Sequence, residues 1–275
     1  MREFLSARSW CAVTSCGLEQ QVQEQLGGFR ISCSDEQATL LVAHLRLVVE
    51  KNKVMNLTRI VDAEEAVTLH VVDSLLPLAC GEVAEGFGCG GAAGFDGDSG
   101  ACGSSVHFVD MGTGAGFPGI PLGIMTGASG LLIDSVGKKI AAVSEFVSAL
   151  GLSALRTLHS RVEDLPSEVM GAQNFVFARA VAQSNVLIEY AAPLLTKGGL
   201  LVLEKARPEE IELERAEKAA KICGMKFVSR ETFELPFERG HREILLYRKV
   251  GKPAIKLPRK VGMAKQSPLG EYNLP

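Results

Sequence analysis

Apolar positions follow two periods along this chain, one typical of helices and one typical of strands. From Val106 onward, short apolar runs alternate with longer segments of helical spacing. This alternation predicts a mostly parallel sheet with right-handed crossovers. A turn at 238–240 joins the last two strands, which predicts a hairpin with one antiparallel strand. The expected strands are 106–110, 130–134, 155–159, 174–178, 199–203, 226–235 and 241–247, with helices at about 118–126, 136–150, 186–195 and 208–223.

A small helical unit is expected before the sheet. Ser34 followed by Gln37 forms a capping box, and apolar positions at helical spacing extend this helix to about Lys53. Asp62 with Glu65 is a second capping signature. The helix that it opens carries one polar edge, made of His70, Asp73 and Ser74.

These signals divide the chain into five parts. The stretch 81–105 is rich in Gly, Ser and Ala, so it buries too little apolar surface to offset its ordering entropy. Its Cys89 and Cys102, with His107, fit no zinc spacing, and we expect no metal. The predicted parts are a variable N-terminal extension (1–33), the helical unit (34–80), a disordered insertion (81–105), a catalytic α/β domain (106–248) and a basic tail (249–275).

Composition narrows the class of protein. The chain has 275 residues, 47% hydrophobic, which suits one globular domain with a small appendage. No apolar run approaches the roughly 18–20 residues of a membrane span, and the first residues lack the apolar core of a secretory signal. Seven cysteines without a C-x-x-C pair indicate a reducing compartment, so a cytoplasmic protein without a membrane partner is expected.

Charge is distributed unevenly. The formal net charge is −3, but residues 248–265 hold seven basic residues and no acidic one. Removing these seven from the 29 basic residues leaves 22 against 32 acidic residues elsewhere. Such asymmetry favours a basic arm that binds a polyanion, with a frayed solvated terminus as the alternative.

The stretch 106–122 carries the strongest chemical signal. A buried strand ends in Asp110, and Gly112, Gly114 and Gly116 follow at alternate positions. Glycines let the backbone turn tightly and approach a ligand closely. The spacing up to Gly119 also fits a dinucleotide fingerprint, but a carboxylate at the loop repels pyrophosphate and suits the cationic S-adenosylmethionine. The alternatives are a dinucleotide and a tight turn without ligand.

Further polar residues follow the other strands. Asp134 ends the second strand and can accept from both ribose hydroxyls of an adenosine. Val162 and Glu163 follow the third strand, where they meet an adenine edge or simply favour a helix N-terminus. Arg179 closes the fourth strand and can pair a methionine carboxylate or a substrate phosphate, and Lys205 after the fifth strand can do similar work less specifically.

Two sequence motifs that are missing bear on which atom accepts the methyl group. The fourth strand is followed by neither an Asn/Asp-Pro-Pro-aromatic motif nor a Pro-Cys pair, which methylation of exocyclic amines and of pyrimidine carbon 5 would need. An acceptor that is already nucleophilic, such as guanine N7, needs neither device. Positioning and electrostatics then supply most of the rate, and Arg179 is the candidate for that role.

The residues 110–122, with their Phe117-Pro-Gly-Ile-Pro extension, resemble the signature of the RsmG (GidB) family of bacterial small-subunit rRNA guanine-N7 methyltransferases. Further blocks are similar, at 52–58, 70–74, 135–139, 160–164, 179–182 and 257–269. The similarity covers about 35–80 and 106–270. Two departures are Val48-Val49-Glu50 where an aromatic residue is frequent, and Ala206 where a glycine is usual; the family does not explain the insertion 81–105.

This resemblance implies a class I S-adenosylmethionine-dependent methyltransferase with a Rossmann-like, seven-stranded, mostly parallel sheet. It implies methylation of N7 of one guanosine in the 530 loop of 16S rRNA, by a protein that is expected to be monomeric. The implied cofactor contacts are Gly112, Phe117, Val162, Glu163 and Arg179. The candidate RNA contacts are His70, Asp73, Lys205, Lys256, Arg259, Lys260 and Lys265. The alternative for His70 is a satisfied histidine that braces the helical unit. Alternative hypotheses are an NAD-linked oxidoreductase and a non-catalytic RNA or ribosome binder on the same fold.

Overall fold

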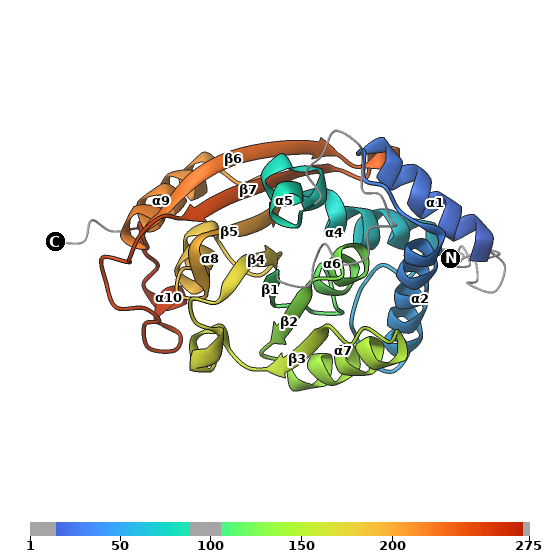
Figure 1. Ribbon diagram of the computed structural model, residues 1–275, viewed down its shortest axis with the longest axis horizontal. Helices are drawn as coiled ribbons and strands as arrows, with labels where there is room; N and C mark the ends of the chain where they lie inside the picture. Colours follow the sequence, from blue (N-terminus) through green and yellow to red (C-terminus); the bar gives the residue numbers. More distant parts are fainter. Residues whose placement is uncertain (1–14, 89–105, 272–275) are drawn as a thin grey trace, which may run out of the picture.

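The computed structural model describes residues 15–88 and 106–271. Seven strands form one sheet in the order β3-β2-β1-β4-β5-β7-β6 (Figure 1). β1 to β5 are parallel, and β7 runs antiparallel to both β5 and β6, so the predicted mostly parallel sheet with a final hairpin is confirmed. The strands are β1 (His107–Met111), β2 (Ser129–Asp134), β3 (Leu155–His159), β4 (Gln173–Arg179), β5 (Leu195–Lys205), β6 (Met225–Glu234) and β7 (His241–Lys249).

Helices cover both faces of this sheet. Figure 1 shows α1, α2 and α4 to α7 on one side, and α8, α9 and α10 on the other. The α-helices are α1 (Ser15–Gly28), α2 (Asp35–Asn52), α3 (Ala63–Ala66), α4 (Asp73–Leu75), α5 (Gly81–Gly86), α6 (Gly119–Thr126), α7 (Gly137–Ala149), α8 (Ser184–Ala191), α9 (Glu210–Ile222) and α10 (Met263–Gln266). The η segments are η1 (Val67–Val72), η2 (Leu76–Ala79), η3 (Val162–Asp164), η4 (Ser167–Val169) and η5 (Pro236–Glu238).

The strands carry apolar side chains on both faces, as parallel strands covered by helices must. Alternate residues point to opposite faces, so Phe108 and Phe177 pack with the N-terminal helices while Val109 and Ala178 pack with α8 and α9. The same alternation decides on which face a polar residue at the end of a strand lies.

The N-terminal helices begin where the capping signals predict. The hydroxyl of Ser34 accepts from the Gln37 backbone N–H at 3.2 Å, and the Gln37 side chain accepts from the Ser34 N–H at 2.9 Å. Asp62 caps α3 through the N–H of Glu65 at 2.9 Å. The described part of the N-terminal extension is not separate from this unit, since Leu18 and Val22 of α1 are buried in the same core as α2.

The prediction of a disordered insertion from residue 81 is wrong for residues 81–88. These residues form α5 and its C-terminal turn, with Val83 and Phe87 buried. The ring of Phe87 stacks on that of Phe175 in β4, with centroids 4.5 Å apart. The prediction rested on the average composition of 81–105, which did not reveal the two apolar residues that anchor this helix. Residues 89–105, with Cys89 and Cys102, lie outside the described residues.

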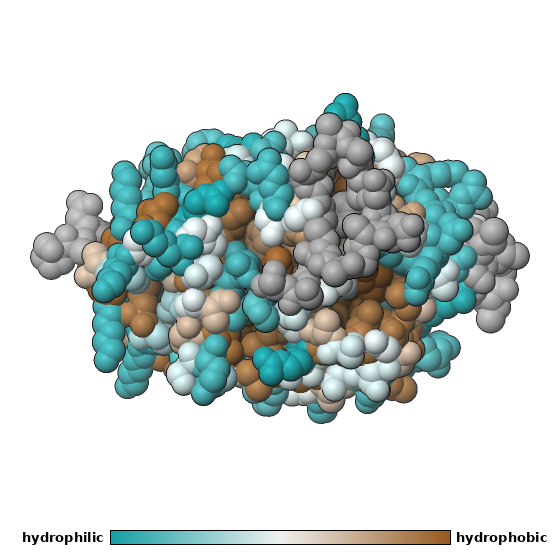
Figure 2. All heavy atoms as spheres, in the orientation of Figure 1, coloured by the Kyte–Doolittle hydropathy of each residue, from teal (hydrophilic) through white to brown (hydrophobic). Residues whose placement is uncertain are grey.

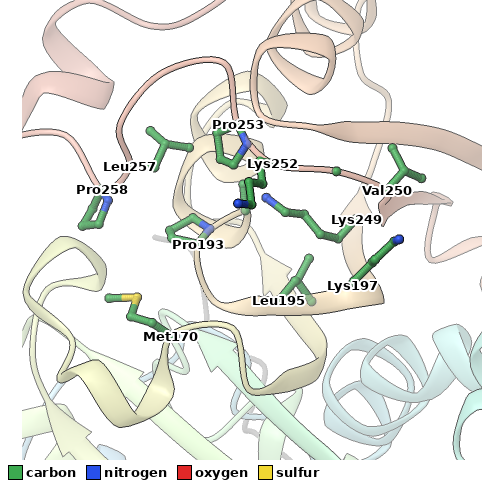
Figure 3. A pocket seen from close by; sticks show the side chains of 12 residues that line it. Met170, Pro193, Leu195, Lys197, Lys249, Val250, Lys252, Pro253, Leu257 and Pro258 are labelled. Atoms are coloured by element: carbon green, nitrogen blue, oxygen red, sulfur yellow. The ribbon is translucent and has the colours of Figure 1, made fainter.

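The C-terminal segment is packed against the catalytic domain and is not a free arm. Ala264 of α10 and Leu269 are buried, and the Asn185 amide of α8 donates to the Leu269 carbonyl at 2.8 Å. The first residues of this tail, together with the start of β5, enclose an apolar cavity (Figure 3). In Figure 2, hydrophilic side chains gather at the end of the molecule that carries α9 and the tail, with apolar residues showing between them. Within residues 15–88 and 106–271, no helix is both long and apolar enough to cross a bilayer.

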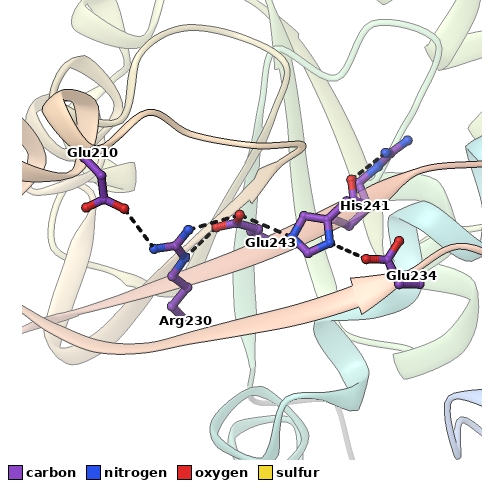
Figure 4. Close-up of polar contacts among 6 residues, drawn as sticks. Glu210, Arg230, Glu234, His241 and Glu243 are labelled. Carbon is purple, nitrogen blue, oxygen red and sulfur yellow. Dashed lines mark hydrogen bonds and ion pairs between the residues drawn. The ribbon is translucent and has the colours of Figure 1, made fainter.

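A polar network holds the hairpin of β6 and β7 in register (Figure 4). The Arg230 guanidinium donates to both carboxylate oxygens of Glu243, at 2.6 and 3.1 Å, and lies 3.8 Å from Glu210. The His241 ring lies between Glu234 and Glu243, at 2.6 and 3.3 Å. Since Glu243 is almost fully buried, these contacts supply the hydrogen-bond partners that its carboxyl oxygens need there.

Candidate functional site

The glycine loop between β1 and α6 needs its glycines for two physical reasons. Gly112, Gly114 and Gly116 have φ values of +76°, +61° and +95°, a region that other residues rarely adopt. A Cβ at Gly112 would lie 2.7 Å from the Val181 side chain, and one at Gly116 would lie 2.6 Å from Ile120. At Gly112 and Gly116 the loop is therefore packed closely, against Val181 just after β4 and against α6.

Asp110 stabilises this loop from the interior of the protein. Its carboxylate has no exposed surface and accepts from the Gly119 N–H at 2.9 Å, at the N-terminus of α6. Burial raises the pKa of Asp110 to about 6. Because it does not line the cleft described below, this geometry assigns Asp110 to loop support and gives no direct support to its predicted cofactor contact.

A polar cleft of about 420 Å³ opens at the carboxyl ends of β1 to β4. Of the predicted cofactor residues, Gly112, Asp134, Val162 and Glu163 line it, whereas Asp110, Gly114, Gly116, Phe117 and Arg179 do not. The remaining lining residues are Ile133, Ser135, Val136, Lys139, Ser160, Arg161, Ala180, Val181, Tyr190, Gly262 and Lys265.

Asp134 connects this cleft to the glycine loop. One carboxylate oxygen accepts from the Gly114 N–H at 3.1 Å, and the other accepts from the Val136 N–H at 2.9 Å. A carboxylate offers about four lone-pair sites, so both oxygens retain capacity for further donors such as ribose hydroxyls. The residues present therefore fit the adenosine end of S-adenosylmethionine.

Glu163 joins the cleft to the C-terminal tail, a link that sequence reasoning missed. One of its carboxylate oxygens accepts both from the Tyr190 hydroxyl at 3.2 Å and from the Gly262 N–H at 3.1 Å. The two donors come from α8 and from the tail, so spacing along the chain carried no signal for this contact. The tail forms one wall of the cleft, with Lys265 as its basic lining residue.

The helical unit holds the glycine loop from its other side. The Phe117 ring stacks on the His70 ring, with centroids 4.6 Å apart and planes at 11°, and lies 4.5 Å from the His44 ring. The His44 Nε2–H donates to the Ala115 carbonyl at 3.0 Å. Burial lowers the pKa of His70 to about 3 and that of His44 to about 4, so both rings are neutral near pH 7.

The block 52–58 stabilises this arrangement one step further out. The Asn52 side-chain oxygen accepts from the N–H groups of Leu57 and Thr58, at 2.7 and 3.0 Å. The Thr58 hydroxyl lies 2.8 Å from Nε2 of His70. A sequence block that showed only a turn or new cap thus orients the ring that stacks on Phe117.

Arg179 does not point freely into the cleft. Its guanidinium donates to Asp73 at 3.2 Å and to the Leu69 carbonyl at 3.3 Å, and it lies 5.6 Å from the centroid of the Phe117 ring. Arg242 donates to the other oxygen of Asp73 at 2.7 Å. The prediction that His70 and Asp73 form an RNA-facing edge is corrected here, because both side chains are buried in this contact.

Glu204 completes this buried group and was missed by sequence reasoning. It pairs with Arg179 in the register of β5 and β4, and it is 4% exposed. Among the described residues, neither of its carboxylate oxygens has a hydrogen-bond partner. Burial raises the pKa of Glu204 well above its ordinary value, because a charged carboxylate is poorly solvated there. We call Asp73, Arg179, Glu204 and Arg242 the buried charge cluster.

The basic residues that were predicted to contact RNA fall into two groups. Lys205 donates to Glu212 at 2.7 Å and to the Ala182 carbonyl, and Arg259 binds the buried Glu189 through two hydrogen bonds of 2.6 and 2.5 Å. These two residues hold the fold together, which removes the geometric support for an RNA role. The side chains of Lys256, Lys260 and Lys265 are exposed, so their contact with RNA stays a prediction.

Comparison with known proteins agrees with this geometry. The family described as GidB, rRNA small subunit methyltransferase G, matches residues 100–243. The ribosomal RNA small subunit methyltransferase G of Carboxydothermus hydrogenoformans is 32% identical over 255 residues, which cover 92% of this chain and 100% of that protein. The protein of the same name from Lactococcus lactis subsp. lactis is 34% identical over 244 residues, which cover 88% of this chain and 94% of that protein.

Among solved structures, the antibiotic-resistance methyltransferase Kmr is 20% identical with a TM-score of 0.45, covering 54% of this chain and 89% of that chain. The strand order with its antiparallel β7 is that of class I methyltransferases. The match to relatives over nearly their whole length decides against the NAD-linked oxidoreductase. The chain belongs to the rRNA small subunit methyltransferase G family and is an S-adenosylmethionine-dependent methyltransferase.

Proposed function

We propose that this protein transfers the methyl group of S-adenosylmethionine to N7 of a guanosine in the 530 loop of 16S rRNA. The observation that carries the proposal is the polar cleft beside the glycine loop, in a chain of this family. Guanine N7 attacks through its own lone pair, so the site needs no general base. The cleft then has to position the two reactants, which its glycine loop and lining residues can do.

A second groove supports a place for the acceptor nucleotide. It measures about 470 Å³ and shares Val181 and Lys265 with the cofactor cleft. Gln183 and Gln266 line it and offer amide donors and acceptors to a base edge. Its one acidic residue, Glu271, is paired with Arg215 at 3.1 Å. We infer that the target base is presented outward from the RNA into this groove.

Arg179 acts in this proposal as a positioning residue. It fixes the end of β4, and the next residue, Ala180, adopts a left-handed φ of +55° that directs the chain into the cleft. Val181 then packs on Gly112 of the glycine loop. Through this short path, the contact between Arg179 and Asp73 sets the position of the backbone that faces the methyl group.

Methyl transfer tests the proposal directly. The protein is incubated with tritiated S-adenosylmethionine and either 16S rRNA or small subunits that lack this modification. Label should appear at one guanosine of the 530 loop, where reduction and aniline cleavage report N7 methylation. Label elsewhere, or none with either substrate, contradicts the proposal. Binding of RNA without any transfer would favour the non-catalytic alternative.

A charge variant tests the acceptor groove. Lys265→Met should lower the magnitude of the slope of log affinity for RNA against log salt by about 1, because one phosphate contact is lost. Lys226→Met, at an exposed position in β6 outside both grooves, is the matched control and should leave the slope unchanged. An unchanged slope in Lys265→Met would show that the RNA phosphates pass elsewhere.

The proposal includes a cytoplasmic monomer. Cys33, Cys80 and Cys223 are free thiols, as a reducing compartment requires. Light scattering coupled to gel filtration should return one chain of 29.3 kDa. A dimer of twice that mass would contradict the monomer.

A further inference from the structure

A second cavity lies at the opposite edge of the sheet from the cofactor cleft, and the two cavities share no residue. It occupies about 560 Å³, which is within the usual range for small-molecule sites. The start of β5, the end of β7 and the first residues of the tail enclose it (Figure 3). Its lining consists of Met170, Ala192, Pro193, Leu195, Lys197, Lys249, Val250, Gly251, Lys252, Pro253, Leu257 and Pro258.

The lining of this cavity is apolar, and its only charged residues are basic. Most of the lining side chains are aliphatic or proline rings, and three are lysines. None of the twelve residues is acidic, and none is aromatic. An apolar wall with only positive charge selects a ligand that has an apolar body and one negative group. The lack of an aromatic ring removes the stacking platform that binding of a nucleobase would use.

Lys249 is the residue that makes this a built site. It is only 8% exposed, and its ammonium donates to the Cys223 carbonyl at 3.0 Å. An ammonium has three donors, and no further hydrogen bond of this group is recorded among the described residues. In Figure 3 its side chain extends toward Pro193 and Lys252, among the lining residues. Burial lowers the pKa of Lys249, as expected for a buried cation without a carboxylate beside it.

From this geometry we propose that the cavity is a binding site for a small organic anion with an aliphatic body, of the class of a medium-chain monocarboxylate. The carboxylate accepts from the Lys249 ammonium, with Lys252 contributing at the mouth of the cavity. The aliphatic chain lies against Leu195, Leu257 and Met170. The ligand supplies the negative charge that the lining lacks, and its aliphatic chain buries the apolar surface of the cavity away from water.

Methionine-methyl NMR on the full chain tests the site with defined probes. Sodium octanoate is titrated into protein labelled with ¹³C at its methionine methyl groups, and the Met170 signal is assigned from Met170→Leu. Octanoate should shift the Met170 signal and should bind at least tenfold more tightly than octan-1-ol or octylammonium, which share its chain. Equal affinity for the three probes, or no shift of Met170 at millimolar octanoate, overturns the proposal.

Lysine variants test which ammonium group binds the carboxylate of the ligand. Lys249→Met removes the ammonium but keeps most of the apolar stem of the side chain, so it should weaken octanoate at least tenfold while leaving octan-1-ol unchanged. Lys218→Met, at an exposed position of α9 outside the cavity, is the matched control and should bind octanoate as the unaltered protein does. Lys252→Met should weaken octanoate less than Lys249→Met. Octanoate affinity that is the same in Lys249→Met and Lys218→Met overturns the proposal, and the probe comparison in the unaltered protein does not depend on how either variant folds.

Discussion

The cofactor cleft and the buried charge cluster both lie at the carboxyl ends of the parallel strands, yet they treat charge in opposite ways. In the cleft, Asp134 and Glu163 border open space and hold backbone N–H groups with capacity to spare. In the cluster, Asp73 of the helical unit and Glu204 of β5 are both buried. Position at a strand end therefore does not decide whether a polar residue meets a ligand. The face on which the side chain lies, and what covers that face, decide it.

The comparison also separates two kinds of function. The cleft residues are open to a ligand, whereas the cluster positions the backbone that surrounds it. Arg179 belongs to the cluster although its sequence position resembled a ligand contact. Its partners are the Asp73 carboxylate and the Leu69 carbonyl, which come from segments more than a hundred residues earlier. Four predictions test this division, in order of decreasing effect.

The largest effect is expected from Asp73→Asn. The substitution removes the carboxylate shared by Arg179 and Arg242 and leaves two largely buried cations without a counter-charge. Breaking such a buried pair costs about 3 kcal/mol of the free energy of unfolding. Urea unfolding measures it. Asp164→Asn, at an exposed position beside the cleft, should change stability by less than about 0.5 kcal/mol. Equal stability of the two variants would mean that the arginines do not depend on Asp73.

A smaller effect, on binding, is expected from Asp134→Asn. Loss of a charged acceptor for ribose hydroxyls should cost about 2 kcal/mol, or roughly thirtyfold in the Kd of S-adenosylmethionine. Calorimetric titration measures it, again with Asp164→Asn as control. An unchanged Kd would show that the Asp134 carboxylate serves only the Gly114 and Val136 N–H groups, and the cleft would then resemble the cluster.

The sequence predicted most of the fold, because periodicity and caps are local. The strands, the hairpin and the cap at Ser34 each depend on neighbouring residues. The glycine loop was also local: a tight turn was expected there, and Gly112, Gly114 and Gly116 form it with positive φ values. The contacts that the sequence did not predict are long-range. The bond from Gly262 to Glu163 and the stacking of His70 on Phe117 join segments whose meeting no spacing encodes. The anchor Phe87 was missed because composition was averaged over its stretch.

Glu204→Gln tests, through pH, the cluster carboxyl that has no hydrogen-bond partner among the described residues. Since burial raises the pKa of Glu204 in the folded state, the folded protein holds a proton that the unfolded chain releases above about pH 4.5. Folding of the unaltered protein is therefore penalised increasingly as the pH rises from that value. The variant lacks this penalty, so its stability should gain on the unaltered protein by at most about 1.4 kcal/mol per pH unit. Chemical unfolding at pH 5 and at pH 6 measures the difference, which over this one unit cannot exceed about 1.4 kcal/mol. Parallel stability curves would mean that Glu204 is ionised and paired after all.

The smallest effect is expected at the contact between the cleft and the tail. Tyr190→Phe removes the hydroxyl that, with the Gly262 N–H, holds the Glu163 carboxylate. Without the hydroxyl, Glu163 is less well oriented to accept from Gly262; if this weakens that contact by about 1 kcal/mol, local opening of the tail becomes about fivefold more frequent. Hydrogen exchange across residues 262–269 measures this opening. Tyr247→Phe, whose ring packs on Phe227 in the hairpin, is the matched control and should leave that exchange unchanged. If Tyr190→Phe also leaves it unchanged, the tail is held by the burial of Ala264 and Leu269 and by the Asn185 bond to the Leu269 carbonyl, and the Tyr190 contact with Glu163 does not fix this wall of the cleft.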